Sequence, residues 1–358
     1  MRPPRRVQEV VSGKMLGRFV TPRWFSIAPF LLLALAAHEA RAGATLDKVR
    51  AAGALTCGID TEQPEYTLDD AHGNHGAFDL DLCKAVAAAV LGENAKLVVK
   101  TFRDEAGSLK ALAAGEIDLL ATASVNLRTA NGSFALARTM FYDHQGLLVN
   151  KSGGIRSLAD LRGKKICFLV GTEIERQLTA YMQREKIAFV PGPFSEEGEM
   201  EAAFVTGNCA AVSADVSQLA YERIAFRNRS QNFEILPGIV AKDPLAPAVR
   251  SGDPQWAAIV DWTMQALIQA EESGVTQANA AEMKKSNDLV VRRLLGAEKG
   301  WGQFLALDDD WAARAIGAVG NYGEIFERDL GSGSPMKLER GMNNLWTKDG
   351  LMAADPIR

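Results

Sequence analysis

The chain has 358 residues, of which 47% are hydrophobic and 23% charged, and its formal net charge is −4 at pH 7. This length is sufficient for two domains that each have a hydrophobic core. The composition is that of a globular protein, so it excludes a disordered chain and a polytopic membrane protein.

The N-terminal segment has the features of a secretory signal peptide. Arg18 and Arg23 precede an apolar run over residues 25–37, and residues 40–42 (Ala-Arg-Ala) have the pattern of a cleavage site. We therefore expect residues 1–42 to be removed on export, and Met15 is a second candidate for the start. The mature chain would carry 33 basic and 42 acidic residues, a net charge of −9. Such an acidic protein is a poor partner for nucleic acid.

The first part of the mature chain alternates between strand and helix patterns. We expect helices over residues 46–52, 79–90 and 105–114, and strands over 54–59, 96–102 and 117–120. A loop over residues 60–76 has little periodicity. Strand–helix alternation is typical of an α/β fold with a mainly parallel sheet.

A second α/β pattern begins at residue 151. We expect helices over 157–161, 173–184, 196–207 and 216–225, and strands over 164–169, 188–190, 210–213, 233–235 and 239–240. After Pro244 the pattern changes to helices, which we expect over 253–272, 279–285, 290–295 and 309–324. Trp256 and Trp262 lie on the apolar face of the first of these helices, so core packing is their expected role.

This order of elements predicts two lobes. Lobe 1 would be discontinuous, with residues 43–147 and 244–358, and lobe 2 would comprise residues 148–243. Two crossover strands would join the lobes at a hinge. Ligands of open α/β sheets bind at the carboxyl ends of the strands, which would face each other across the cleft between the lobes.

Three features of this cleft would suit a zwitterion. Arg128 is a lone cation in an irregular polar segment, and its planar guanidinium matches a carboxylate. Gly171 and Thr172 follow a strand and start a helix, where free N–H groups favour an anion. Asp215 ends a strand and would receive an ammonium group. The alternatives are structural roles: a surface arginine, a threonine N-cap and an aspartate helix cap.

Other chemistries have less support. His72 and His75 form an HxxH pair, but their position in a loop without an acidic partner argues against a metal site. The sequence contains no GxSxG nucleophile motif, and it contains no Walker or dinucleotide-binding glycine pattern. We therefore expect neither a catalytic residue nor a cofactor.

Four cysteines lie in the mature part of the chain, and their spacing matches no CxxC metal pattern. In an oxidising compartment they allow two disulfides, with three connectivities. We favour Cys57–Cys83 with Cys167–Cys209, because each pair falls within one half of the chain. The other two connectivities stay open at this point.

The sequence resembles the periplasmic solute-binding proteins of ABC transporters for polar amino acids, especially the general L-amino-acid-binding proteins. The segments that carry the resemblance are residues 78–88 (FDLDLCKAVAA), 244–279 and 321–352. The resemblance implies a type II periplasmic binding protein, an α/β fold with two lobes, two hinge strands and a helical C-terminal extension. It also implies a monomer that captures a free amino acid in the periplasm and delivers it to an inner-membrane ABC permease.

Residue by residue, the resemblance assigns Arg128 and Thr172 to the ligand α-carboxylate and Asp215 to the α-ammonium group. A loop that packs on the ligand side chain in relatives supplies Gln63 and Tyr66. The expected ligand-binding set is Gln63, Tyr66, Ser124, Arg128, Gly171, Thr172 and Asp215.

The sequence also departs from the family pattern. Residues 121–127 form a segment about two residues shorter than usual, which leaves the contacts from lobe 1 open. Glu173 replaces a second threonine, and we expect it to disfavour acidic ligands. A periplasmic dehydratase of the cyclohexadienyl or arogenate type shares this fold, and Glu173 or Glu65 would be its general acid or base. An amino-acid sensing protein is a third possibility.

Overall fold

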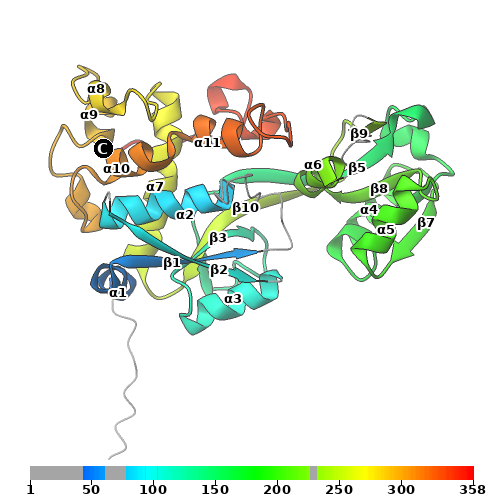
Figure 1. Ribbon diagram of the computed structural model, residues 1–358, viewed down its shortest axis with the longest axis horizontal. Coiled ribbons are helices and arrows are strands. Elements are labelled where there is room, and N and C mark those ends of the chain that lie inside the picture. Colours follow the sequence, from blue (N-terminus) through cyan, green and yellow to red (C-terminus); the bar gives the residue numbers. More distant parts are fainter. Residues whose placement is uncertain (1–42, 61–77, 93, 103, 226–231) are drawn as a thin grey trace, which may run out of the picture. The chain divides into compact units, whose positions relative to one another are not determined.

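The computed structural model describes residues 43–60, 78–92, 94–102, 104–225 and 232–358 (Figure 1). The expected signal peptide lies outside the described residues, as does the loop with Gln63, Tyr66 and the two expected loop histidines. None of the helices in the described ranges is long and apolar enough to cross a membrane.

The described strands form one sheet with the order β2-β1-β3-β10-β5-β8-β6-β7, and β4 and β9 pair with β10 and β5. The strands are β1 (Ala54–Asp60), β2 (Lys96–Phe102), β3 (Leu119–Ser124), β4 (Phe134–Leu136), β5 (Phe141–Asn150), β6 (Lys165–Leu169), β7 (Val190–Phe194), β8 (Ala211–Asp215), β9 (Phe233–Ile235) and β10 (Ala241–Arg250). Strands β1, β2 and β3 are mutually parallel, and so are β6, β7 and β8.

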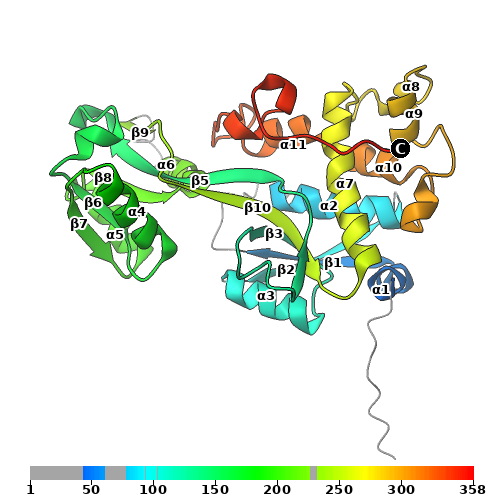
Figure 2. The same ribbon diagram turned by 180° about the vertical axis from the view of Figure 1, so that it is seen from behind.

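Two long antiparallel strands, β5 and β10, connect these parallel groups (Figures 1 and 2). Beyond their shared ladder, β10 pairs with β3 and β5 pairs with β8. We call β1–β4 with their helices lobe 1, β6–β9 with their helices lobe 2, and β5 and β10 the hinge strands. Each lobe has core clusters of its own.

The helices divide between the lobes in the same way. Lobe 1 has α1 (Ala44–Ala52), α2 (Phe78–Leu91), α3 (Glu105–Ala114), α7 (Pro254–Glu272), α8 (Ala280–Met283), α9 (Leu289–Leu294), α10 (Trp311–Val319) and α11 (Tyr322–Asp329). Lobe 2 has α4 (Glu173–Arg184), α5 (Glu197–Val205) and α6 (Val216–Ala225). The expected helix over 157–161 is a short 3-10 helix, Leu158–Leu161, capped by Ser157.

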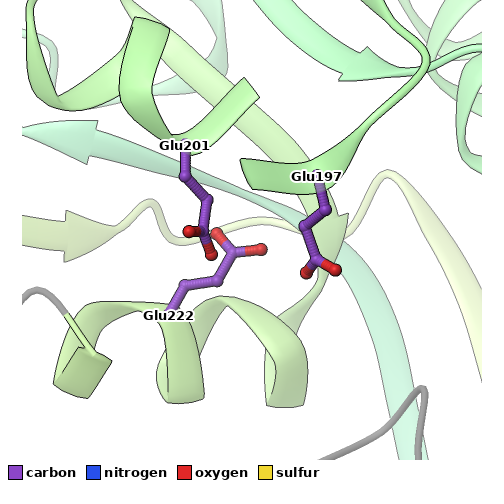
Figure 3. Close-up of side chains that lie close together, drawn as sticks. All are labelled: Glu197, Glu201 and Glu222. Atoms are coloured by element: carbon purple, nitrogen blue, oxygen red, sulfur yellow. The ribbon is translucent and has the colours of Figure 1, made fainter. Parts of the chain in front are cut away.

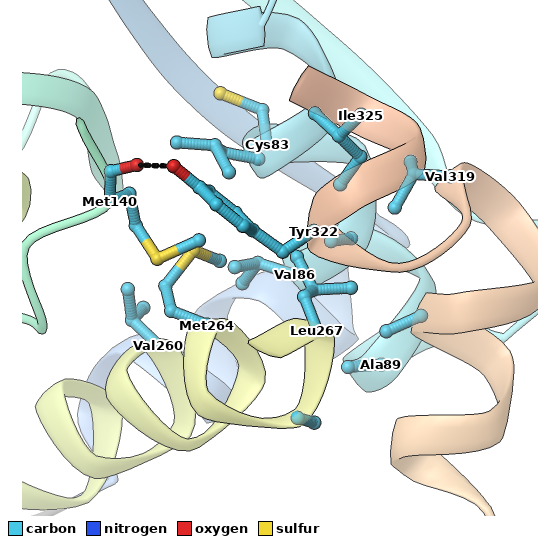
Figure 4. Close-up of a cluster of buried hydrophobic side chains, with 14 of the residues drawn as sticks. Cys83, Val86, Ala89, Met140, Val260, Met264, Leu267, Val319, Tyr322 and Ile325 are labelled. Carbon is cyan, nitrogen blue, oxygen red and sulfur yellow. Dashed lines mark hydrogen bonds between the residues drawn. The ribbon is translucent and has the colours of Figure 1, made fainter. Parts of the chain in front are cut away.

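The C-terminal helices belong to the core of lobe 1. Tyr322 of α11 is fully buried among side chains of α2 and α7, and its hydroxyl donates a hydrogen bond to the Met140 carbonyl oxygen at 2.8 Å (Figure 4). Because a buried hydroxyl needs a partner, this bond fixes the ring orientation. Trp256 is likewise buried, as expected, and its indole Nε1 donates to the Asp118 carbonyl oxygen at 2.8 Å.

The C-terminal tail contacts hinge strand β5 directly. The Asn343 side-chain oxygen accepts a hydrogen bond from the Tyr142 backbone N–H at 2.7 Å, and its amide donates to the Tyr142 carbonyl at 3.3 Å. Arg340 anchors the tail, because its guanidinium makes two hydrogen bonds to Glu271 of α7, at 2.6 and 3.0 Å. The side chain of Asn343 thus pairs with β5 as a neighbouring strand would.

Several expected elements were wrong in position or extent. The run over 239–240 is only the approach to a ten-residue strand, β10, which contains Pro244 and Pro247. Proline lacks the N–H that a central strand needs, but Pro247 lies where the register with β3 shifts, and both prolines accept hydrogen bonds through their carbonyls. The strand expected over 188–190 is β7, whose two prolines fit its position at the edge of the sheet.

The helix expected over 309–324 is two helices, α10 and α11. Gly320 ends α10 with a φ of +89°, and Asn321 begins α11 with a capping box that includes Glu324. These are the signals that stop one helix and start another.

The favoured disulfide pairing is confirmed. Cys57 of β1 is bonded to Cys83 of α2, with a Cα–Cα distance of 6.2 Å. Cys167 of β6 is bonded to Cys209, just before β8, with a Cα–Cα distance of 5.9 Å. Each bond therefore joins elements of a single lobe.

Asp253 fastens the start of the described chain to helix α7. Its buried carboxylate accepts backbone hydrogen bonds from Gly43 at 2.9 Å, Thr45 at 2.8 Å and Trp256 at 3.1 Å. Burial alone would raise the pKa of Asp253, but these N–H groups outweigh it and hold the pKa below its usual value of 3.8. The stabilisation is therefore present above about pH 4 and is lost as the pH falls through the lowered pKa.

We expect Asp253→Ala to lower the free energy of unfolding at pH 7 by about 2 kcal/mol, because it removes a helix cap and leaves buried N–H groups unpaired. Asp253→Asn keeps an acceptor oxygen and should lose less. Urea denaturation of both variants at pH 7 measures the effect. An Asp253→Ala midpoint equal to that of the wild type would contradict this role.

Candidate functional site

A pocket of about 660 Å³ lies where the two lobes meet the hinge strands. Lobe 1 contributes Glu105 and residues 122–128. Lobe 2 contributes Glu173, Ile174, Gln177, Asp215 and Gln218, and β10 contributes Lys242, Asp243 and Leu245. Of the expected ligand-binding residues that the structure describes, Ser124, Arg128 and Asp215 line this pocket.

Arg128 is held in a turn that follows β3. The Asn126 side-chain oxygen accepts hydrogen bonds from the backbone N–H groups of Arg128 at 2.8 Å and Thr129 at 3.3 Å. The buried Thr129 hydroxyl donates to the Ser124 carbonyl at 2.6 Å, which closes the turn. The Arg128 side chain is exposed, and no described residue pairs with its guanidinium. It is therefore free to receive a carboxylate in two parallel hydrogen bonds.

Ser124 has its polar groups engaged within the protein. Its backbone N–H donates to the Glu105 carboxylate at 2.8 Å, and its hydroxyl donates to the Asp243 carboxylate. Ser124 thus links lobe 1 to hinge strand β10, and a ligand acceptor that took the hydroxyl proton would have to displace Asp243.

Three carboxylates gather at the hinge: Asp143 of β5, Asp243 of β10 and Asp215 at the end of β8. We call them the hinge aspartates. Asp143 and Asp243 are directly opposite in the β5–β10 ladder, and Asp215 is opposite Gln145 of β5. Asp143 is buried, and it accepts hydrogen bonds from the Ser217 hydroxyl and from the His144 N–H at 2.7 Å.

Asp215 and Asp243 line the pocket, and Asp143 is buried in β5 opposite Asp243. Burial raises the pKa of Asp143 to about 6, and the charge of Asp243 adds to this effect. Burial and the charges of Asp143 and Asp243 raise the pKa of Asp215 well above its usual value. Burial also raises the pKa of Asp243, although the Ser124 hydroxyl opposes this. Carboxylates that repel one another in this way would be stabilised by a bound cation.

Gly171 and Thr172 are at the start of α4 and do not line the pocket in this structure. The Thr172 hydroxyl is an N-cap, because it accepts from the Glu175 N–H at 3.3 Å and donates to the Leu169 carbonyl at 2.7 Å. Gly171 has a φ of +78°, and its N–H donates to the Glu175 carboxylate at 2.7 Å. A ligand carboxylate that used this helix end would take the place of the Glu175 side chain.

Glu173 does line the pocket, as expected of a residue near its mouth. Its carboxylate pairs with Arg176, one turn along α4, at 2.5 Å, so its charge is partly neutralised. The negative charge of the pocket therefore depends on the hinge aspartates more than on Glu173.

The sequence reasoning missed Asp243 and Gln145. Gln145 is buried in β5, and its amide donates to the Ile174 carbonyl at 2.9 Å and to the Ser213 hydroxyl at 2.8 Å. It thus ties a hinge strand to α4 and β8 of lobe 2. Their position in the sequence could have identified them, because both residues lie on the crossover strands that the element order predicts.

Residues 55–278 match the profile of the bacterial extracellular solute-binding proteins, family 3. The chain belongs to this family. It is 43% identical to the general L-amino acid-binding periplasmic protein AapJ of Rhizobium johnstonii, over 91% of this chain and 96% of that protein. It is 40% identical to the glutamate/glutamine/aspartate/asparagine-binding protein BztA of Rhodobacter capsulatus, over 91% of this chain and 97% of that protein.

A solved structure of a related protein has the same fold as this family 3 protein. An ABC transporter periplasmic binding protein from Brucella ovis, solved with glutathione bound, is 40% identical and has a TM-score of 0.78. The match covers 88% of this chain and 99% of that chain. The type II periplasmic-binding-protein fold expected from the sequence is thereby confirmed.

Proposed function

We propose that this family 3 protein binds a free L-amino acid between its lobes in the periplasm and delivers it to an inner-membrane ABC permease. One observation carries the proposal: the guanidinium of Arg128, which pairs with no described residue, lines the same pocket as two of the hinge aspartates, Asp215 and Asp243. An α-amino acid carries a carboxylate and an ammonium group on one carbon, so it would satisfy both charges. The names of AapJ and BztA as amino-acid-binding proteins support this ligand class.

In this arrangement Arg128 holds the α-carboxylate and Asp215 holds the α-ammonium group, with Asp143 and Asp243 behind it. Closure of the lobes about β5 and β10 would exclude water and strengthen these charge contacts. The proposal keeps the lobe boundaries expected from the sequence, with residues 148–243 as lobe 2. Residues 1–42 act as the export signal, and the mature protein works as a monomer.

The pocket favours neutral or basic side chains over acidic ones. Its lining contains four acidic side chains, Glu105, Glu173, Asp215 and Asp243, and two basic ones, Arg128 and Lys242. After Arg128 and Asp215 have paired with the ligand backbone, three acidic groups and one basic group remain for its side chain. An acidic ligand side chain placed among these groups would be repelled by the carboxylates.

A ligand screen tests the proposal. Purified residues 43–358, freed of bound ligand by unfolding and refolding, are incubated with each of the twenty amino acids and with glutathione. A ligand at a hundredfold excess over its Kd stabilises the protein by about 2.7 kcal/mol, which raises Tm by about 4 °C for a chain of this size. The expected result is a shift with several amino acids, larger for arginine or glutamine than for glutamate.

The outcomes separate the alternatives. A rise in Tm with glutathione alone would indicate that the ligand is a peptide and not a free amino acid. A shift with no amino acid would overturn the proposal. The bound amino acid should also be recovered unchanged after prolonged incubation, since we propose no catalytic role, and turnover of a cyclohexadienyl amino acid would indicate an enzyme instead.

Amino-acid affinity should fall on acidification, because protons compete with the ligand ammonium group for the hinge aspartates. The pKa of Asp143 is raised from 3.8 to about 6, so this group stabilises the ligand-free protein most below about pH 4, and that stabilisation is lost as the pH rises through 6. We expect about tenfold weaker binding at pH 5 than at pH 7 by isothermal titration calorimetry, and a flatter profile for Asp143→Asn. Equal affinity at both pH values would contradict this prediction.

A further inference from the structure

Three glutamates of lobe 2 form a cluster that has no part in the proposed amino-acid site. Glu197 and Glu201 lie one turn apart on α5, and Glu222 lies on the neighbouring helix α6. One carboxylate oxygen of each lies within 4.8 Å of the others. Figure 3 shows the carboxylates of Glu201 and Glu222 directed at each other, with that of Glu197 beside them. None of the three lines the pocket.

Glu222 is the unusual member of this cluster. Its residue is only 1% exposed, yet neither carboxylate oxygen accepts a hydrogen bond from the described residues. A buried carboxylate without a partner is strongly unfavourable. Its side chain nevertheless points toward the two other carboxylates and not into solvent. This arrangement lacks a positive charge.

No cationic side chain in the described part of the chain supplies that charge. None of the ion pairs found there involves any of the three glutamates. The polar contact to the cluster is Gln218, whose side-chain amide donates to Glu197 at 2.7 Å. Its amide is neutral, so it brings no positive charge to the cluster.

We propose that Glu197, Glu201 and Glu222 bind a divalent cation, preferably Ca²⁺. All three donors are carboxylate oxygens, which hard cations prefer, and Ca²⁺ tolerates irregular geometry better than Mg²⁺. Glu197 is exposed and Glu201 half-buried, so water can complete the coordination shell on the open side. The ion would join α5 to α6 and give the Glu222 carboxylate the positively charged partner that it lacks.

Calcium titration of the metal-free mature protein tests the site, with no amino acid present. Calorimetry should detect one ion per chain with a Kd of about 10⁻⁴–10⁻³ M, the range of extracellular calcium modules with few protein ligands. In 10 mM CaCl₂, Tm should rise by about 2–4 °C relative to NaCl of the same ionic strength. Mn²⁺, counted by its electron paramagnetic resonance signal, should compete for the same site.

Glu222→Gln and Glu201→Gln should each weaken Ca²⁺ binding at least tenfold. Glu199→Gln is the matched control, because it removes an exposed carboxylate from the same helix α5 and should leave the Kd unchanged. Circular dichroism checks the fold of each variant. Because Glu201 is half-exposed, Glu201→Gln tests the site without changing the core. The proposal would be overturned if the wild type bound Ca²⁺ no more tightly than Glu222→Gln, or if Glu199→Gln lost as much Ca²⁺ affinity as Glu222→Gln. Glu222 would then be a protonated core residue.

Discussion

Arg128→Gln should bind amino acids at least about thirtyfold more weakly than the wild type. Removing one partner of a hydrogen-bonded charge pair in a closed cleft costs about 2–5 kcal/mol, because the other charge is left without its partner. In the ligand-free protein Arg128 is exposed and has no ion pair with a described residue, so Tm without ligand should stay the same. Calorimetry at pH 7, with the best ligand of the screen, measures the loss.

Two further variants make this result specific. Arg128→Lys keeps the charge but loses the planar fork, so it should recover only part of the affinity. Arg156→Gln removes an exposed arginine of lobe 2 that does not line the pocket, and it should bind as the wild type does. Unchanged affinity in Arg128→Gln would show that the carboxylate binds elsewhere, with Lys242 as the other cation in the pocket.

The double variant Cys167→Ala/Cys209→Ala should lose about 4 kcal/mol of unfolding free energy, as expected for a disulfide that closes a loop of 42 residues. Both cysteines are buried in a core cluster of lobe 2 with Phe204 and Phe233, so alanine avoids the cost of a buried hydroxyl. Urea denaturation without ligand measures the change.

The remaining disulfide provides an internal comparison. Cys57–Cys83 closes a loop of 26 residues, for which the same relation gives about 3.5 kcal/mol. Adding a reductant to the double variant should therefore produce a second loss of similar size, in lobe 1. An unchanged urea midpoint in the double variant would show that the Cys167–Cys209 bond does not stabilise lobe 2.

Where local signals were complete, the sequence predicted elements to the residue. Helix α3 begins after Asp104, whose carboxylate caps the Gly107 N–H, and it ends at Gly115 in the left-handed conformation. Helix α4 begins after the N-cap Thr172. In both cases the determinants lie within the segment itself, so no tertiary information was needed.

Elements and site residues that depend on distant partners could not be predicted in this way. Strand β10 contains two prolines and is stabilised by β3 on one side and β5 on the other. Its register places Asp243 opposite Asp143, a pairing that no local pattern indicates. Arg128, by contrast, was identifiable as a candidate because it is the cation in the polar segment that follows a predicted strand, and Asp215 because it ends a strand.

The contact between Asn343 and Tyr142 gives the C-terminal tail a mechanical role. Asn343 follows Tyr142 by 201 residues, yet it occupies the backbone hydrogen-bonding groups of a hinge strand next to Asp143. We therefore expect the stiffness of the hinge to depend on a segment that does not line the pocket. A substitution in the tail would change how fast the cleft opens and closes, and so the rate of ligand release, without altering any atom that touches the ligand.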